Sequence, residues 1–200
     1  AGDVRRNALS DFTNVRANGK IAMDLPENVE LVNARIATQD DDVMLVTKSG
    51  RAIRFSTNAV RVFKGRKSTG VRGVRLTGDD CVVSMSILRH FEASSDERAA
   101  YLKMRRAVAG MVDDERAGTE DEEVSANATI SPERYAEMSA AENLILTISS
   151  RGSGKLSSSH DYPVRGRGGM GVAAMDKAMR GGDLVASFPV DLEDQIMLAT

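Results

Sequence analysis

The apolar residues of the chain fall into short runs that are separated by turn-forming Gly, Asn and Asp. Runs of about four to eight residues with such boundaries are typical of antiparallel β-strands. One kind of run leads into a turn, and it occupies residues 41–50, 142–152 and 193–200. A second kind follows a glycine-rich segment, and it occupies residues 29–38, 80–88 and 182–190. We expect all six runs to form strands.

A longer segment is repeated three times along the chain, at residues 2–25, 50–76 and 152–175. Each copy begins with Gly and a short cationic strand, passes through a polar bend, and ends in Gly followed by an alternating apolar strand. Four strands in a period of about 50 residues indicate the blades of a propeller-like array. We therefore predict an all-β fold with about three blades' worth of antiparallel sheet, which is too few to close a usual ring.

Residues 89–142 interrupt the repeat with a pattern typical of helices. A capping-box signature, Ser94 with Glu97, opens a first helix. Ser131 followed by Pro132 opens a second, shorter one. The first helix carries an apolar stripe on one face, which we expect to pack on the domain. The stripe consists of Tyr101, Met104, Val108 and Met111.

The chain is expected to form one domain that is truncated at both ends. Its parts are blades at residues 1–88, a helical and acidic insertion at 89–142, and blades again at 143–200. The last strand, at residues 195–200, would leave an open sheet edge, which proteins normally protect. We expect this strand to pair with the N-terminal segment or with a second copy of the chain.

The composition of the chain bears on its cellular compartment and on whether it binds a metal. Apolar residues make up 42% of the chain, which suits a folded core, and no apolar run approaches the roughly 20 residues that cross a bilayer. We therefore expect no membrane association. The single Cys81 cannot form an internal disulfide, so we expect a reducing, cytoplasmic compartment. Because Cys81 lies in an apolar run, we expect its thiol to be buried. His90 and His160 have no second ligand at metal-binding spacing, so we expect no metal site.

The net charge of −2 hides a strong segregation of charge. No acidic residue lies between Asp42 and Asp79, and many of the compensating acids gather at residues 113–124. A turn rich in Gly and Arg suits phosphate, because glycine lets the backbone approach and Arg offers a planar fork of donors. Glycine can equally supply positive φ at tight turns. The cations in the acid-free stretch are Lys48, Arg51, Arg54, Arg61, Lys64, Arg66, Lys67, Arg72 and Arg75.

The basic stretch favours contact with the backbone of duplex DNA. Only 4% of the residues are aromatic, whereas proteins that bind single strands need aromatic stacking platforms. We expect the aromatic residues Phe55, Phe63 and Tyr162 to lie in the core or in turns. We expect the three aspartates at residues 40–42 to lie in a solvated loop. The sequence holds no Walker A, GxSxG, HExxH or DxDxDG motif. We therefore expect neither catalysis nor bound ATP or NAD in this chain.

Three stretches of the sequence resemble one protein family. The blades of the C-terminal domain of DNA gyrase A subunits are closely similar to "DDVMLVTKSGRAIRFSTNAVRVFKGRKSTGVRGVRL". Neighbouring blades of that domain are similar to "RRNALSDFTNVRANGKIAMDL" and "DLEDQIMLAT". The related domain of topoisomerase IV A-type subunits is less similar. The resemblance implies a β-pinwheel, a six-bladed relative of the propeller, whose basic perimeter bends and wraps duplex DNA to support negative supercoiling.

The resemblance also implies partners and a set of DNA-facing residues. In that family, ATP and Mg are used elsewhere in an A2B2 complex, which joins the rest of the A subunit to the B subunit. The motif "GRGGMG" resembles the family's diagnostic glycine box but lacks its Lys, so we do not expect this chain to supercoil DNA alone. A propeller that docks an acidic protein partner is the alternative. The implied DNA-facing residues are Arg5, Arg6, Arg51, Arg54, Lys64, Arg66, Lys67, Arg72, Lys155, Arg165 and Arg167.

Overall fold

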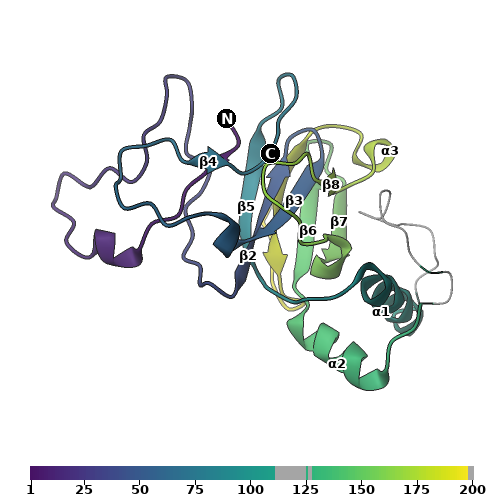
Figure 1. Ribbon diagram of the computed structural model, residues 1–200. Helices are drawn as coiled ribbons and strands as arrows, with labels where there is room; N and C mark the ends of the chain where they lie inside the picture. Colours follow the sequence, from purple (N-terminus) through teal and green to yellow (C-terminus); the bar gives the residue numbers. More distant parts are fainter. Residues whose placement is uncertain (111–124, 126–127, 198–200) are drawn as a thin grey trace.

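Two antiparallel sheets form the body of the protein (Figure 1). The computed structural model describes residues 1–110, 125 and 128–197. The larger sheet has the strand order β5-β2-β3-β8, and the smaller one has the order β7-β6-β9. A further two-stranded sheet pairs β1 with β4. The strands are β1 (Asp3–Val4), β2 (Asp41–Thr47), β3 (Arg51–Ser56), β4 (Val71–Arg72), β5 (Val82–Arg89), β6 (Leu144–Ser149), β7 (Gly154–Ser158), β8 (Val172–Ala173) and β9 (Leu184–Val190).

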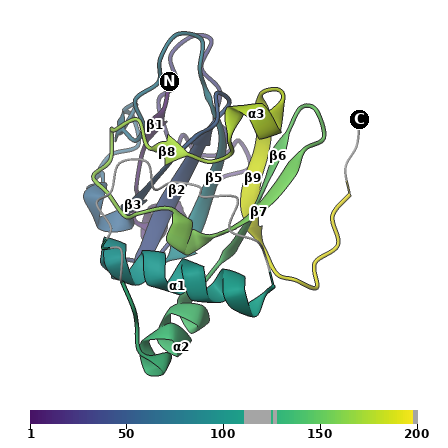
Figure 2. The ribbon, with the colours of Figure 1, turned by 90° about the vertical axis from the view of Figure 1, so that its right-hand side faces the viewer.

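Helices occupy the connections between these strands. α1 (Ser95–Val108) and α2 (Pro132–Ala141) lie between β5 and β6, beyond one end of the sheets (Figures 1 and 2). None of the described helices is long and apolar enough to cross a membrane. The remaining helices are short: η1 (Leu9–Phe12), η2 (Thr57–Ala59), η3 (Ser159–Asp161) and α3 (Lys177–Arg180).

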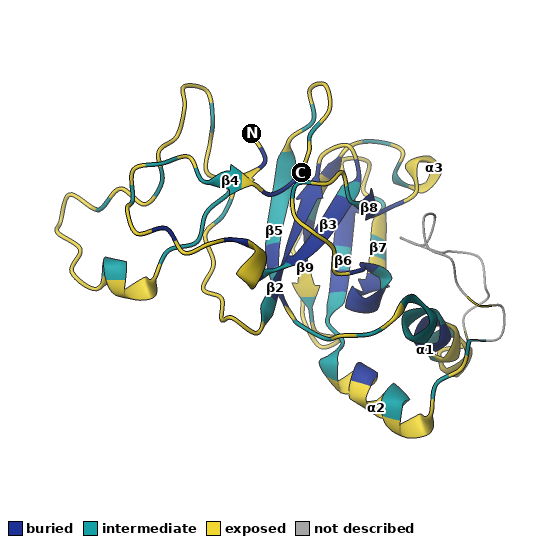
Figure 3. Ribbon diagram, viewed as in Figure 1, coloured by how far each residue is buried: buried dark blue, intermediate teal, exposed yellow. Residues whose placement is uncertain are grey.

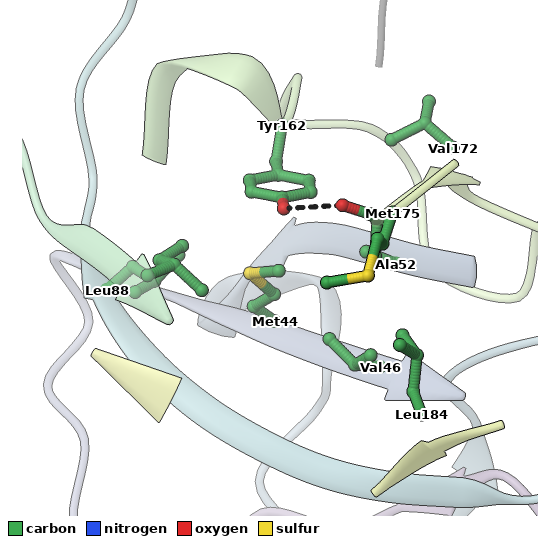
Figure 4. Packing of buried hydrophobic residues seen from close by; sticks show 10 residues of the cluster. Met44, Val46, Ala52, Leu88, Tyr162, Val172, Met175 and Leu184 are labelled. Atoms are coloured by element: carbon green, nitrogen blue, oxygen red, sulfur yellow. Dashed lines mark hydrogen bonds between the residues drawn. The ribbon is translucent and has the colours of Figure 1, made fainter. Parts of the chain in front are cut away.

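β2 is the central strand of the larger sheet, and it is buried along nearly its whole length. It pairs with β3 on one side, where Leu45 lies opposite Ile53, and with β5 on the other. Met44 and Val46 pack toward the smaller sheet, in a cluster that includes Leu184 of β9 (Figure 4). Burial of each such side chain contributes about 1.5 to 3 kcal/mol. The two sheets therefore share one apolar core.

The opposite face of the larger sheet packs on the glycine-containing segments. Leu45 and Ile53 form a second buried cluster with Val74. Val4 and Val71, which pair with each other in the β1–β4 sheet, lie against this cluster. Apolar packing therefore fixes the small β1–β4 sheet to the larger sheet.

The insertion begins and ends as the sequence predicts. Ser94 caps α1, its hydroxyl accepts from the Glu97 amide, and the Glu97 carboxylate completes the capping box. Ser131 caps α2, with Pro132 in the first turn. The stripe prediction holds for Tyr101, which is buried, but is wrong at the C-terminal end of α1. Val108 is 80% exposed and Met104 is partly exposed, while Met111 lies outside the described residues.

A buried histidine joins the insertion to the smaller sheet. The Nε2 atom of His160 donates to the carbonyl of Met138 in α2 at 2.8 Å. The His160 ring also lies edge-on to Tyr101 of α1, with 4.9 Å between ring centroids. Burial lowers the pKa of His160, which favours the neutral ring. The insertion is thus packed on η3 of the smaller sheet's blade.

Two of the six expected strands are not observed in the described residues. Residues 29–38 form no strand, and most of this run is exposed (Figure 3). Leu31 and Ile36 in the run are largely exposed. Residues 193–197 are likewise exposed and without a strand assignment, so the expected pairing with the N-terminal segment is wrong for this part of the run, while pairing with a second copy of the chain stays a prediction. A strand is stabilised only when a neighbour completes its ladder, and the described residues place no such neighbour beside either run.

Two expectations about single residues are also wrong. Cys81 is exposed, because it lies in the turn before β5, where its carbonyl accepts from the Lys48 amide at 2.8 Å. Asp42 is fully buried, because it is the second residue of β2 and not part of a solvated loop. Its two carboxylate oxygens are hydrogen-bonded to Nε of Arg54 and Nδ1 of His90, both at 2.8 Å.

Candidate nucleic-acid interface

Three segments that are far apart in the sequence meet beside the larger sheet. β1 of the first segment pairs with β4 of the second, with Val4 opposite Val71. In the third segment, the amide of Gly168 donates to the carbonyl of Gly73 at 2.6 Å. Each copy of the sequence repeat therefore contributes a strand or a turn to one place. We call this region the basic edge, and it consists of residues 2–7, 61–75 and 164–171.

Glycine allows the backbones of the basic edge to approach one another. Gly70 has φ +99°, and a Cβ atom there would collide with the carbonyl of Val4. Gly171 has φ +73°, and a Cβ atom there would collide with the carbonyl of Ala52. Both positions therefore exclude other residues for two reasons, backbone conformation and space. The structural interpretation of the glycines is confirmed at these two positions.

Arg5 and Arg6 are the cations of the first copy. The Arg5 guanidinium donates through Nη1 to the Ser68 carbonyl at 2.6 Å and through Nε to Oδ1 of Asn7 at 2.9 Å. Nη1 of Arg6 donates to the Thr57 carbonyl at 2.8 Å. Because these acceptors are neutral oxygens, the contacts hold both side chains in place without cancelling their charge.

The second copy supplies four of the predicted cations at the basic edge. Lys64 and Lys67 are exposed and Arg66 is half-buried, and all three lie in the turn that leads to β4. Arg72 is exposed on β4, where its partner in the ladder is Asp3 of β1. This turn is the most cationic part of the basic edge.

The third copy places Arg165 and Arg167 next to the second. Arg167 donates through Nε to the Ala59 carbonyl and through Nη1 to the Arg72 carbonyl, both at 2.9 Å. Arg165 is exposed, and its amide donates to the Arg54 carbonyl at 2.9 Å. Arg167 thus connects the second and third copies while its own side chain stays exposed.

Three predicted residues lie outside the basic edge, namely Arg51, Lys155 and the buried Arg54. Arg51 is half-buried at the start of β3, opposite Ala173 of β8, and borders the edge. Lys155 is half-buried on β7, opposite Thr147, and belongs to the smaller sheet. The structure therefore brings together eight of the eleven predicted cations and separates Lys155 from them.

Arg54 is a structural residue, which corrects its assignment as DNA-facing. Its side chain is 3% exposed, and Nε donates to Oδ2 of Asp42 at 2.8 Å. Nη1 and Nη2 donate to the carbonyls of Ser159 and Arg89, each at 2.7 Å. Burial lowers the pKa of Arg54, while the neighbouring Asp42 raises it. A guanidinium enclosed in this way cannot reach a ligand on the surface.

The structure adds two cations that the candidate set leaves out. Arg61 is exposed, and its guanidinium carbon lies 4.3 Å from the centroid of the Phe63 ring. Arg75 is exposed, and its amide donates to the Gly169 carbonyl at 2.8 Å. Both belong to the acid-free stretch of the sequence, so the segregation of charge was the signal that could have found them.

The sheets and the basic edge define a class of protein, namely antiparallel, bladed all-β domains whose repeats gather cations on one rim. A model of the family described as "DNA gyrase C-terminal domain, beta-propeller" matches residues 4–38, 41–89 and 143–188. The match covers most of the chain and leaves out the helical insertion. The chain belongs to this family, and the predicted all-β fold of the propeller or pinwheel type is confirmed.

DNA gyrase A subunits of several bacteria are similar to this chain over its whole length. The chain is 47% identical to the DNA gyrase A subunit of Granulibacter bethesdensis and 38% identical to that of Rickettsia bellii. Each match covers all of this chain and 22% of the relative, so the chain spans about a fifth of their length. The solved E. coli ParC C-terminal domain matches 84% of this chain, and 49% of that chain, with 13% identity and a TM-score of 0.47.

Proposed function

We propose that this chain is the DNA-binding part of a type IIA topoisomerase, a DNA gyrase A subunit, and that its basic edge bends duplex DNA to support negative supercoiling. The convergence of cations from three repeats on one edge is the observation that carries this proposal. Membership in the gyrase C-terminal family supports it, as do the names of the relatives.

The proposed chemistry is contact with the DNA backbone. Arg and Lys at the basic edge neutralise phosphates and release condensed counterions, which favours binding at low salt. The planar guanidinium of an exposed arginine such as Arg72 can donate two parallel hydrogen bonds to one phosphate. Bending a site of 20 to 30 base pairs costs about 1 to 6 kcal/mol, which several added phosphate contacts offset. Backbone contacts of this kind carry little sequence preference.

In this proposal the chain itself catalyses no reaction. Strand cleavage belongs to the rest of the A subunit, while ATP hydrolysis with Mg belongs to the B subunit. Both are the proposed partners of this chain in an A2B2 complex, and the chain would present a bent segment of DNA to them. The assignment of cleavage and ATP hydrolysis to other parts of the complex rests on the family relationship. The chain itself spans only about a fifth of the length of its relatives.

The proposal predicts an affinity that depends on salt and on DNA length. Replacing Arg66, Lys67 and Arg72 together by Ala should weaken binding and reduce the slope of log affinity against log salt by up to about 0.9 per lost phosphate contact. The measurement is a fluorescence titration with duplexes of increasing length at several salt concentrations. Wild-type affinity should rise over tens of base pairs, as a bent path requires.

A matched control replaces three exposed cations that lie away from the basic edge. These are Lys103 of α1, Arg151 in the β6–β7 turn and Lys177 of α3. The control removes the same charge but should keep the wild-type salt slope to within about one lost contact. Equal loss in both triple variants would mean that net charge, and not the basic edge, determines binding. Weak, length-independent binding by the wild type would instead favour docking of an acidic protein.

A further inference from the structure

Phe63 lies between two arginines of the basic edge. Its side chain is 6% exposed, yet the guanidinium carbons of Arg5 and Arg61 lie 4.7 and 4.3 Å from the centroid of its ring. Arg5 belongs to the first copy of the repeat and Arg61 to the second, so the ring also joins the two copies. The ring is therefore buried and also in contact with two cations.

Arg5 is held in one orientation by three further contacts. Nε donates to Asn7, while Nη1 donates to both the carbonyl and the hydroxyl of Ser68. The side chain of Asn7 is fixed in turn, because its Nδ2 atom donates to the carbonyl of Phe63 at 3.3 Å. A guanidinium has five N–H donors. Within the part of the chain that the structure describes, the contacts of Arg5 use Nε and Nη1, which leaves the donors on Nη2 for another acceptor.

Arg61 is exposed, and its contact with the Phe63 ring orients its guanidinium. An unrestrained arginine loses side-chain entropy when it is fixed. A guanidinium already stacked on a ring has less freedom to lose when it binds. Stacking uses the face of the guanidinium and leaves its edge, with the N–H donors, directed away from the ring.

We infer that Phe63 is a positioning residue that holds Arg5 and Arg61 ready to contact phosphates of one DNA backbone. Arg61 is thereby assigned as a phosphate contact, although the resemblance did not imply it. The inference rests on the proposed function, since it names how that site prepares two of its cations. It also assigns Phe63 a role beyond packing.

Two variants separate this role from packing and from charge. Phe63→Leu keeps an apolar side chain but removes the aromatic face, and Arg61→Lys keeps the charge but removes the planar group that stacks. Each should weaken DNA binding about two- to fivefold. The salt slope should stay as in the wild type, because no charge is lost. In the Phe63→Leu background, Arg61→Lys should have little further effect.

The matched control is Phe55→Leu, at a phenylalanine of the larger sheet that is fully buried in the apolar cluster. This variant should lose stability but keep wild-type affinity at a temperature where it is folded.

The inference is overturned if Phe63→Leu binds as the wild type does, or if Arg61→Lys weakens binding equally in both backgrounds. Should Phe63→Leu fail to fold, the exposed Arg61→Lys still decides, since wild-type affinity would contradict the stacking role. Loss of salt-dependent binding in the wild type would instead remove the proposed function itself.

Discussion

At the scale of single residues, Arg54 shows how a cation in a basic stretch can belong to the fold. Its guanidinium reaches Asp42 on the neighbouring strand, Ser159 in the other blade and Arg89 at the start of the insertion. The acid-free stretch that contains it suggested a ligand contact. Charge patterning alone cannot separate the two roles, because the partner of Arg54, Asp42, lies just outside that stretch and reaches it only through strand pairing.

Replacing Arg54 by Ala should destabilise the protein strongly. The change leaves the buried carboxylate of Asp42 without its guanidinium, and breaking a buried pair costs about 3 to 5 kcal/mol. The measurement is the free energy of unfolding from urea denaturation. Arg51→Ala, on the same strand, is the control and should stay within about 0.5 kcal/mol. A stable Arg54→Ala protein with a reduced salt slope would return Arg54 to the DNA-contacting surface.

Asp161 provides a test in which pH is the variable. Burial raises the pKa of Asp161 to about 6, and the hydrogen bond from the Ser158 amide only partly opposes this. A folded-state pKa above the unfolded value means that this carboxyl favours folding below pH about 4 and loses that contribution as the pH rises through 6. Asp161→Asn keeps an acceptor for the cap but cannot ionise.

Asp161→Asn should therefore be more stable than the wild type at pH 7.5, by about 1 to 2 kcal/mol for this half-buried side chain. The difference should disappear near pH 4, where both side chains are neutral. Thermal unfolding monitored by circular dichroism at the two pH values measures it. A variant that is less stable than the wild type at pH 7.5 would show that the ionised carboxylate stabilises η3.

At the scale of elements, the sequence predicts a strand correctly where the chain also holds its partner. Residues 41–50 and 80–88 lie in apolar runs, and β2 and β5 pair there. Residues 29–38 have a similar pattern but form no strand, because no partner pairs with them in the described chain. Periodicity reports the preference of a segment, while the strand itself depends on its neighbour. The helix starts at Ser94 and Ser131 were predictable because capping is local.

The same distinction applies to the basic edge. The repeat of Gly and Arg was visible in the sequence, and it identified most of the cations that the structure brings together. The separation of Lys155 was not visible, because the smaller sheet turns its copy of the cationic strand away from the edge. The stacking of Arg5 and Arg61 on Phe63 was not visible either, since it joins residues from two copies of the repeat.

At the scale of the whole molecule, the basic edge depends on the packing of the two sheets. Its third segment follows Tyr162, which lies in the core that the sheets share, and Leu184 of β9 belongs to the same cluster (Figure 4). A rigid shared core keeps Arg165 and Arg167 at a fixed position relative to the cations of the second copy. The curvature imposed on a duplex would therefore be determined by the core as much as by the surface.

This dependence predicts that the two sheets unfold together. Differential scanning calorimetry should show one transition, with equal calorimetric and van't Hoff enthalpies. Leu184→Ala removes a buried side chain from the shared core and should cost about 2 to 5 kcal/mol, shifting that single transition to lower temperature. Val185→Ala, at an exposed position next to it, should have little effect. Two separate transitions, of which Leu184→Ala moves only one, would mean that the sheets fold independently and that the basic edge is flexible between its second and third segments.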